Sequence, residues 1–255
     1  IALIGFIDDH RHIAARYRLI VHFSAAAWTC SWLGVIPWGD THNSLVLSLL
    51  WGGSLFYLVW MLNLYNFMDG IDGIATIEGI TVLASAALLL FFSSFQTDTA
   101  GLPIELLLTL AAILLGFLVW NWPPAKIFMG DVGSAFLGIV MAAFSLITAN
   151  NGSLDFLIWI ILLAIFISDA TYTLLVRLFR GEKIYQAHRS HTYQILSRRF
   201  GHKTVTLGVL LINGCWLLPL AWLGHNCAEF LILCVMLAYI PLIALAVKSH
   251  AGQRE

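Results

Sequence analysis

Apolar runs of membrane-spanning length dominate the chain. A helix needs about 20 apolar residues to cross the hydrocarbon core of a bilayer, and runs of that length recur with short polar stretches between them. We identify such segments at residues 18–36, 45–65, 75–95, 104–121, 133–150, 154–176, 205–224 and 228–247. The opening stretch IALIGFI reads as the last turns of a further helix, because it lacks the basic region and cleavage site of a signal peptide. The pattern predicts an all-α, polytopic bundle with about eight spanning helices.

Composition agrees with this class. Of the 255 residues, 60% are hydrophobic and 11% are charged, and the mean hydropathy is +0.87. Soluble domains carry about 25% charged residues, so an ordinary soluble protein is excluded. We find no repeat, low-complexity tract or soluble insertion, and we expect one integral membrane domain over residues 1–255. The four cysteines form no CxxC pair and are interpreted as packing residues rather than as a redox or metal site.

The basic residues predict the topology. If the segments alternate in direction, all 13 Lys and Arg fall in or beside the loops on one side of the membrane. Those loops are residues 1–17, 66–74, 122–132, 177–204 and 248–255. By the positive-inside rule this side is cytoplasmic. We therefore predict a multi-pass membrane protein with these loops in the cytoplasm.

Five aspartates lie on the same side, at or near helix ends. They are Asp8, Asp9, Asp69, Asp72 and Asp131. Carboxylates near a membrane are costly unless they serve a site. We expect them to converge, together with His188 and His191, on an active site at the cytoplasmic face.

The first acidic pair lies in IGFIDDHRH. Adjacent residues of a helix point about 100° apart, so Asp8 and Asp9 can hold different roles, one on a cation and one on a proton. The alternative is a solvated loop start. Arg16 and Arg18 follow, either as cytoplasmic anchors or as a clamp for phosphate.

The second pair lies in NLYNFMDGIDGI. Asn66 ends a spanning segment, and Asp69 and Asp72 are spaced to share one helix face. Gly70 permits close backbone approach, and the amides of the following helix favour an anion. A broken or re-entrant helix lining a polar cavity fits this pattern, and a simple turn is the alternative.

The third motif is NWPPAKIFMGDVGSAFLG. Pro123 and Pro124 end one helix, Phe128 offers an aromatic face, and Asp131 lies where the next helix opens. Asp131 is either the N-cap of that helix or a ligand of Mg²⁺.

The longest polar stretch, residues 177–204, contains two histidines beside an arginine. His188, Arg189 and His191 suit a pyrophosphate better than zinc, because no thiolate accompanies them. Asp169, inside a spanning segment, either pairs with a helix neighbour or borders the pocket.

Topology alone explains three other basic residues of this stretch, Arg198, Arg199 and Lys203. We therefore expect replacement of Arg198 by Ala to have little effect. His22 is interpreted as a hydrogen-bonding residue at a helix interface.

Four motifs together carry a family resemblance. In order they are DD at 8–9, NFMDGIDGIA at 66–75, NWPPAKIFMGDVGSAFLG at 121–138 and AHRSH at 187–191. The chain resembles the polyprenyl-phosphate N-acetylhexosamine-1-phosphate transferases over essentially its whole length. AHRSHTYQ is most similar to the O-antigen branch, whose members use UDP-N-acetylglucosamine or UDP-linked deoxy sugars. Family members have further helices before the first aspartate pair, which this sequence lacks.

The resemblance implies roles for the acidic residues. Asp8 matches the acid/base or nucleophilic carboxylate near the lipid phosphate, and Asp9 supports it. Asp131 matches the Mg²⁺ ligand, with Asp72 as a second ligand, and Mn²⁺ is expected to substitute. His188 and His191 match the family's histidine motif and are counted as catalytic.

The resemblance also places the nucleotide, with Asn121 and Phe128 at the positions that hold uracil. The full set of predicted substrate-binding residues is Arg16, Arg18, Asn66, Asp69, Gly70, Asp72, Asn121, Phe128 and Arg189. Where some members carry an acid or Lys this chain has His12, whose role is open, and Thr192 stands where a third histidine is found in the family.

The expected reaction is phosphoryl transfer. A polyprenyl phosphate oxygen attacks the β-phosphorus of a UDP-sugar, releasing UMP and leaving a polyprenyl-diphosphate-sugar, in one step or through a phosphorylated aspartate. The expected partners are these two substrates and membrane lipid, without nucleic acid, and a homodimer is left open.

Two other classes of membrane protein place carboxylates in or beside spanning helices. An ion-coupled secondary transporter also uses broken helices and carboxylates, but its sites lie near the midplane. An intramembrane aspartyl protease would use Asp131 and Asp169 and leave the other aspartates without a role.

Overall fold

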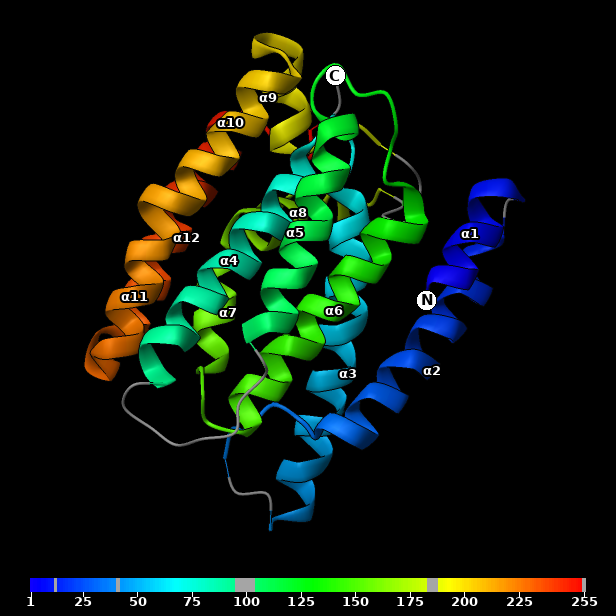
Figure 1. Ribbon diagram of the computed structural model, residues 1–255. Coiled ribbons are helices and arrows are strands. Elements are labelled where there is room, and N and C mark those ends of the chain that lie inside the picture. Colours follow the sequence, from blue (N-terminus) through cyan, green and yellow to red (C-terminus); the bar gives the residue numbers. More distant parts are fainter. Residues whose placement is uncertain (12, 40–41, 95–103, 183–187, 254–255) are drawn as a thin grey trace. The chain divides into compact units, whose positions relative to one another are not determined.

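The apolar segments fold into helices, as the hydrophobic pattern predicts (Figure 1). The computed structural model describes residues 1–11, 13–39, 42–94, 104–182 and 188–253, and all secondary structure within these ranges is helical. His12, whose role the sequence left open, lies outside them. The elements are α1 (Ala2–His10), α2 (Ala15–Leu33), α3 (Ser44–Phe67), α4 (Ile74–Ser94), α5 (Ile104–Asn121), α6 (Gly130–Asn150), α7 (Phe156–Leu162), α8 (Ala164–Phe179), α9 (Thr192–Phe200), α10 (His202–Ile212), the π-helical turn η1 (Asn213–Leu217), α11 (Leu218–Asn226), the 3-10 turn η2 (Ala228–Phe230) and α12 (Leu231–Lys248).

The number of helices suited to cross a membrane is smaller than predicted. Six spans are long and apolar enough among the described residues, or seven if α7 and α8 form one bent span. The segment predicted at 18–36 is helical as α2 but is not among them. The all-α, polytopic class is confirmed, with six or seven candidate spans in the described ranges where about eight were expected.

One predicted span is sharply bent. Residues 154–176 were expected to form a single helix, but α7 and α8 meet at an angle of 78°. The break falls at Leu163, whose backbone angles are φ −95° and ψ 10°. Sharp kinks usually follow Pro or Gly, and this segment contains neither. Hydrophobic periodicity therefore had no signal for the bend.

A second irregularity lies in the predicted span 205–224. Here α10, η1 and α11 follow one another, and the π-helical turn begins at Asn213. The Asn213 amide nitrogen donates hydrogen bonds to the Glu78 carboxylate at 2.7 Å and to the Thr81 hydroxyl at 2.6 Å. Both partners belong to α4, so a buried polar contact joins α4 to the irregular turn.

The chain divides into two compact units, each assembled from separate stretches of sequence. Unit 1 comprises Ile1–Asn66, Leu90–Pro103 and Met129–Phe156; unit 2 comprises Phe67–Leu89, Ile104–Phe128 and Leu157–Glu255. The single integral domain that we expected over residues 1–255 stays a prediction.

Close helix contact in unit 1 depends on a glycine. Helix α1 packs against α6 (Figure 1), and a Cβ atom added at Gly5 would lie 2.8 Å from the backbone of Asp131. Real Cβ atoms essentially never come that close. Gly5 therefore lets the end of α1, with its two aspartates, lie directly beside the start of α6.

Helix pairs also build unit 2. Helix α12 packs against α8 and α11, and α9 packs against α10. The Tyr239 hydroxyl of α12 donates to the Ile160 carbonyl of α7 at 3.0 Å. These contacts hold the elements that carry the histidine motif.

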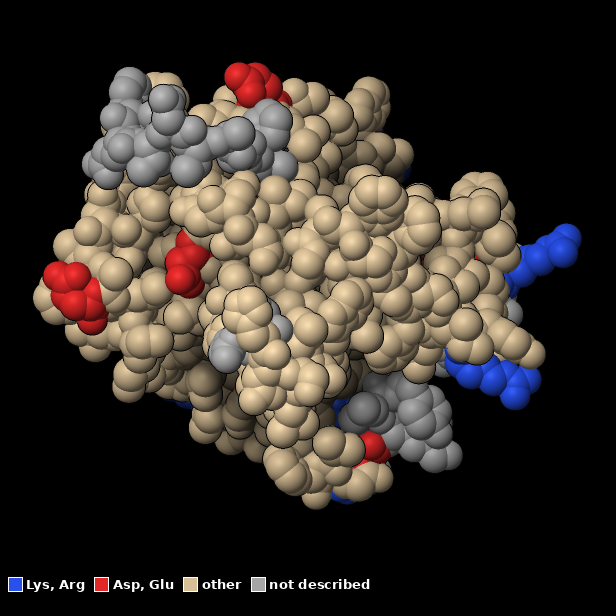
Figure 2. Space-filling view, turned by 90° about the horizontal axis from the view of Figure 1, so that it is seen from below, with Lys and Arg blue, Asp and Glu red and all other residues tan. Residues whose placement is uncertain are grey.

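Charged side chains are sparse on the face of the protein drawn in Figure 2. A few scattered Asp, Glu, Lys and Arg side chains lie there among described residues that are otherwise uncharged. Large apolar side chains such as Trp28, Leu49 and Val119 are mostly exposed. An exposed apolar surface of this extent is expected of a protein whose surroundings are lipid.

Candidate active site

Three aspartates of unit 1 lie close together, and two of them share one arginine. We call Asp8, Asp9 and Asp131 the carboxylate cluster. The Arg18 guanidinium donates through one nitrogen to the Asp8 carboxylate and, at 3.3 Å, to the Asp131 carboxylate. The Asp9 carboxylate accepts the backbone N–H of Asp131 at 3.3 Å. The predicted meeting of the first aspartate pair with Asp131 is thus observed within unit 1.

Local structure fixes each member of the cluster. Asp8 is held by the backbone N–H of Ile13, which donates to it at 2.8 Å. Asp131 follows Gly130 in the first turn of α6, whose N-cap is Met129, without a side-chain cap bond. The alternative that Asp131 is the N-cap is therefore wrong. A side-chain hydrogen bond from Asn66 also reaches the Asp131 carboxyl group.

The chemistry of the cluster fits a hard cation. Asp8 and Asp131 share one guanidinium and Asp9 adds a third carboxylate beside Asp131, so negative charge is in excess, and carboxylate oxygens are the ligands that Mg²⁺ prefers. Among the described residues, no group of three or more His, Cys, Asp or Glu side chains is arranged to hold a metal ion on its own. Mg²⁺ commonly takes one or two carboxylates and receives its other ligands from water and substrate phosphates. The cluster matches that kind of incomplete site.

Arg16 and Arg18 differ in their surroundings. Arg18 is part of the cluster contacts, with its side chain 33% exposed. Arg16 is exposed and its guanidinium stacks over the Tyr17 ring, to whose hydroxyl it also donates at 3.3 Å. The two were predicted together as a phosphate clamp, and the structure brings only Arg18 to the carboxylates.

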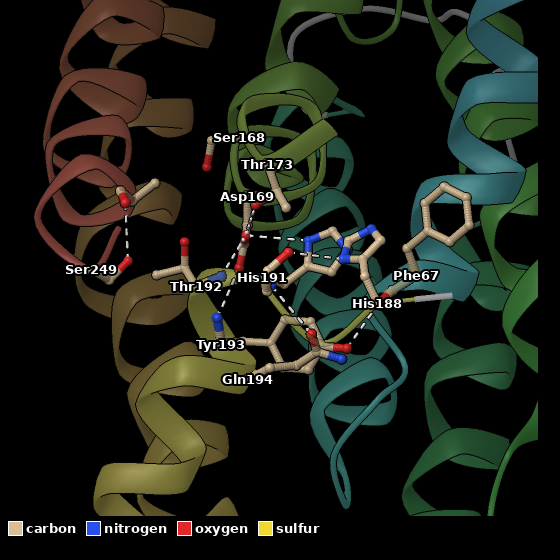
Figure 3. A network of polar contacts seen from close by, with 12 residues as sticks. Phe67, Ser168, Asp169, Thr173, His188, His191, Thr192, Tyr193, Gln194 and Ser249 are labelled. Carbon is tan, nitrogen blue, oxygen red and sulfur yellow. Dashed lines mark hydrogen bonds and ion pairs between the residues drawn. The ribbon is translucent and has the colours of Figure 1, made fainter. Parts of the chain in front are cut away.

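In unit 2, a buried carboxylate organises the histidine motif (Figure 3). The Asp169 side chain of α8 accepts the backbone N–H groups of Thr192 and Tyr193, both at 2.9 Å, and the Thr173 hydroxyl at 3.1 Å. Its carboxylate also lies 3.5 Å from the His191 ring nitrogen Nδ1. Of the two alternatives for Asp169, the contact with a neighbour on its own helix is confirmed, and Asp169 also anchors the start of α9. That it borders the active-site pocket stays a prediction.

The two histidines take different positions. His191 is 2% exposed and its ring stacks on Tyr193 with 5.8 Å between the ring centroids. The His188 ring lies 4.8 Å from that of His191, and its Nδ1 is 3.1 Å from the Ser190 hydroxyl. His191 is thus a buried support, whereas His188 reaches a cavity.

We call this space the histidine–arginine cavity. Its volume is about 540 Å³, and it opens within unit 2 beside the starts of α9 and α10. Its lining residues are Gly70, Ile71, His188, Arg189, Gln194, Ser197, Arg198 and His202. Four of the eight carry cationic or protonatable groups and none is acidic, so the cavity suits an anion.

Two side chains at or near this cavity, His188 and Tyr193, have shifted pKa values. Burial lowers the pKa of His188 from 6.5 to about 4, and the charges of His191 and Arg177 act in the same direction. Burial also raises the pKa of the Tyr193 hydroxyl above its usual range. At neutral pH both groups are therefore uncharged, and His188 would gain a proton most readily when an anion binds beside it.

The DGIDG loop, residues 69–73, contributes Gly70 and Ile71 to this cavity and is held against α9 by a tyrosine. The Tyr193 hydroxyl donates to the Phe67 carbonyl at 2.8 Å, and a Cβ atom at Gly70 would overlap the same hydroxyl oxygen. Gly70 is therefore required by the close approach of α9 to the loop.

Asp72 has mainly structural contacts. Its carboxylate accepts the backbone N–H of Ala125 at 3.1 Å and lies 3.3 Å from Nδ1 of His202, while its carbonyl accepts the Thr206 hydroxyl at 2.9 Å. Asp72 thus joins its own loop, the loop before α6 and the start of α10. Its predicted role as a second metal ligand stays a prediction.

Asn121 and Phe128 also lie in unit 2. Asn121 is 2% exposed; its side chain accepts from the Thr76 hydroxyl at 2.7 Å and donates to the Ile127 carbonyl at 2.9 Å. Phe128, next to Ile127, is 75% exposed. Asn121 shapes the loop that presents the aromatic ring, and uracil binding by the two stays a prediction.

Sequence reasoning overlooked part of the cavity. Arg198 and His202 were assigned no site role, and Gln194 was not considered. A signal was available, because these three residues recur at four-residue intervals, the spacing of one helix face. Gly201 ends α9 between them, which hides the pattern. That all five aspartates share one pocket stays a prediction, since the structure groups Asp8, Asp9 and Asp131 in unit 1 and Asp69 and Asp72 in unit 2.

Comparison with known proteins identifies the family. The model of glycosyl transferase family 4 matches residues 1–149, and the chain belongs to that family. It is 28% identical over 230 residues to a probable undecaprenyl-phosphate N-acetylglucosaminyl 1-phosphate transferase of Bacillus subtilis, covering 84% of this chain and 60% of the relative. It is 29% identical over 255 residues to the phospho-N-acetylmuramoyl-pentapeptide-transferase of Synechococcus elongatus, covering 85% of this chain and 65% of the relative. The chain thus spans less than two thirds of the length of these relatives.

Proposed function

We propose that the protein transfers an N-acetylhexosamine-1-phosphate from a UDP-sugar to polyprenyl phosphate, releasing UMP and forming a polyprenyl-diphosphate-sugar. The observation that carries the proposal is the carboxylate cluster held around Arg18 in a member of this family. The named activities of the two relatives support it, since both are transferases of phosphorylated amino sugars. A family of glycosyl transferases gives no support to the transporter or the protease alternative.

The carboxylate cluster is assigned to the acceptor and the metal. Asp8 removes the proton from the lipid phosphate, and Asp9 supports the start of α6 through the Asp131 backbone. Asp131 would hold Mg²⁺, with Asp72 as the second predicted ligand, and Mn²⁺ is expected to substitute. When bound, the metal neutralises charge on the phosphates during in-line displacement. Arg18, already between two carboxylates, adds a positive charge at the same place.

Unit 2 is assigned to the nucleotide-sugar. His188 and Arg189 line a cavity without acidic residues and are proposed to bind its diphosphate. Phe128, presented by the loop that Asn121 fixes, offers a ring for stacking with uracil. Asp69 and Gly70 belong to the loop that Tyr193 ties to the cavity.

The surroundings of the site are proposed from the predicted topology. The basic loops support a site on the cytoplasmic face of the bacterial inner membrane, where UDP-sugars are available, and the lipid acceptor would enter sideways between helices. The product would begin synthesis of O-antigen or another cell-envelope polysaccharide. N-acetylglucosamine is the first donor to test, because the Bacillus relative is named for it.

The test is an assay of the full-length protein in detergent with polyprenyl phosphate, Mg²⁺ and a panel of UDP-N-acetylhexosamines. We expect release of UMP, rather than UDP, that requires both lipid and Mg²⁺, and the best donor names the sugar. Folded protein that releases no UMP from any donor would contradict the proposal. The alternative of an ion-coupled transporter would then be favoured.

A further inference from the structure

We propose that Arg198 and His202 are substrate-positioning residues that hold the diphosphate of the nucleotide-sugar in the histidine–arginine cavity. The inference rests on the proposed function and extends it to two residues outside the predicted site. It also reverses the expectation that Arg198 is only a topological charge.

The cavity has the size and charge for this ligand. Ligand pockets usually measure about 300–1,000 Å³, and this one has a volume of about 540 Å³. Arg198 and His202 share its lining with His188 and Arg189. Because burial leaves His188 uncharged at neutral pH, most of the positive charge in the free protein comes from the two arginines. A diphosphate needs more than one cationic donor, and the planar guanidinium is well shaped for phosphate oxygens.

Arg198 is held in place at the cavity wall. Its Nη1 donates to the Arg189 carbonyl at 3.0 Å, which joins the last turn of α9 to the segment that contains the histidine motif. The start of the same helix is anchored by Asp169. A guanidinium fixed in this manner loses little conformational entropy when it binds an anion.

His202 is oriented by a carboxylate. Nδ1 of its ring lies 3.3 Å from the Asp72 carboxylate, and the side chain is 45% exposed. With Nδ1 directed to Asp72, Nε2 is the ring nitrogen available to a ligand. The Asp72 backbone N–H also donates to Nδ1 at 3.5 Å, which leaves Nε2 to donate to a phosphate oxygen. Asp72 therefore acts here as a positioning residue for His202.

The neighbouring arginine provides a matched control. Arg199 adjoins Arg198 in α9 but is not part of the cavity lining, and its guanidinium lies over the Phe200 ring, 5.1 Å from the ring centroid. Replacing Arg199 removes the same charge from the same turn without removing a donor from the cavity.

The experiment is calorimetric titration of the full-length protein with UDP and, separately, with uridine. We expect Arg198→Ala and His202→Ala to weaken UDP binding by about 10- to 100-fold, the effect of losing a hydrogen bond to a charged group. Uridine binding should change less than about twofold, because uridine carries no phosphate. Arg199→Ala should leave both affinities unchanged, and Arg198→Lys should restore part of the loss.

A second histidine variant separates positioning from folding. His202→Asn keeps a donor for Asp72 but lacks the second ring nitrogen, so we expect it to fold normally and still lose UDP affinity. In turnover assays these variants should raise KM for the UDP-sugar more than they lower kcat. If Arg198→Ala and His202→Asn both bind UDP as tightly as the wild-type protein does, and the wild-type protein releases UMP, this inference is wrong and the proposed function still stands. A parent protein that neither binds UDP nor releases UMP would overturn the proposed function itself.

Discussion

The Asp169 carboxylate of α8 accepts the backbone N–H of Tyr193 at the start of α9, with 2.9 Å between oxygen and nitrogen. The first amides of a helix have no partner within the helix, so a charged acceptor from another element is a strong anchor. Tyr193 in turn reaches the Phe67 carbonyl through its hydroxyl. Through this pair, α8 positions both the histidine motif and the end of α3 that leads into the DGIDG loop.

Loss of the Asp169 anchor should loosen α9. Asp169→Ala removes the acceptor for two backbone amides and one hydroxyl, and a lost hydrogen bond to a charged group costs about 1.5–3 kcal/mol. We expect a lower free energy of unfolding and faster hydrogen exchange at Thr192 and Tyr193. Asp169→Asn keeps one carbonyl acceptor, so its free energy of unfolding should lie between those of the wild-type protein and Asp169→Ala. Unchanged exchange at these amides in Asp169→Ala would show that other contacts hold α9.

Gly70 and Tyr193 should behave as a coupled pair. Gly70→Ala places a methyl group against the Tyr193 hydroxyl, and overpacking costs about 1–3 kcal/mol. Tyr193→Phe alone loses one hydrogen bond, worth about 0.5–1.5 kcal/mol. Because the clash involves the hydroxyl oxygen, the double variant should recover part of the Gly70→Ala loss. Thermal unfolding of all four proteins forms a double-mutant cycle, and strictly additive effects would contradict the predicted contact.

The carboxylate cluster should be essential for turnover. Asp8→Asn and Asp131→Asn keep the shape of each side chain but remove its charge, and we expect each to abolish UMP release, with a loss of at least about 10³-fold for the general base. Membrane insertion and folding should be retained. Near-normal activity in either variant would remove its assigned role.

Arg18 offers a second test of the cluster. Arg18→Gln leaves Asp8 and Asp131 without their shared guanidinium. We expect lower turnover together with tighter binding of Mg²⁺ by the substrate-free protein, because the metal no longer competes with a bound cation. Arg16→Gln, at an exposed residue away from the cluster contacts, is the matched control and should leave Mg²⁺ affinity unchanged.

The low pKa of His188 predicts a loss of stability in acid. The folded protein holds this pKa at about 4, mainly through burial, against an ordinary value of 6.5. Its contribution is complete above pH 6.5, where both states are neutral, and falls between pH 6.5 and 4, where the unfolded state binds the proton first. His191, Arg177, Glu182 and Asp169 also act on the ring and remain in both proteins of the comparison. The melting temperature of wild type should therefore fall more steeply over this range than that of His188→Gln, and parallel curves would refute the assignment.

Some of the fold was accessible from hydrophobic patterning. Long apolar runs predicted helices, because backbone groups in lipid must be satisfied within the segment itself. The bend at Leu163 was not predicted, because no Pro or Gly marks it. The π-helical turn at Asn213 was missed for a related reason: its polar contact is with Glu78, 135 residues away along the chain.

For the candidate site too, some features could be predicted from the sequence and others could not. Sequence by itself determined that the protein is an all-α membrane protein of this transferase family, since hydropathy, charge asymmetry and motif residues are properties of neighbouring positions. Only the tertiary structure decided that Arg18 bridges Asp8 and Asp131, that Asp169 holds α9, and that Arg198 and His202 line a cavity while Arg199 does not. Those relationships depend on which side chains of distant segments face one another, and the packing of helices, rather than their order along the chain, sets which ones do.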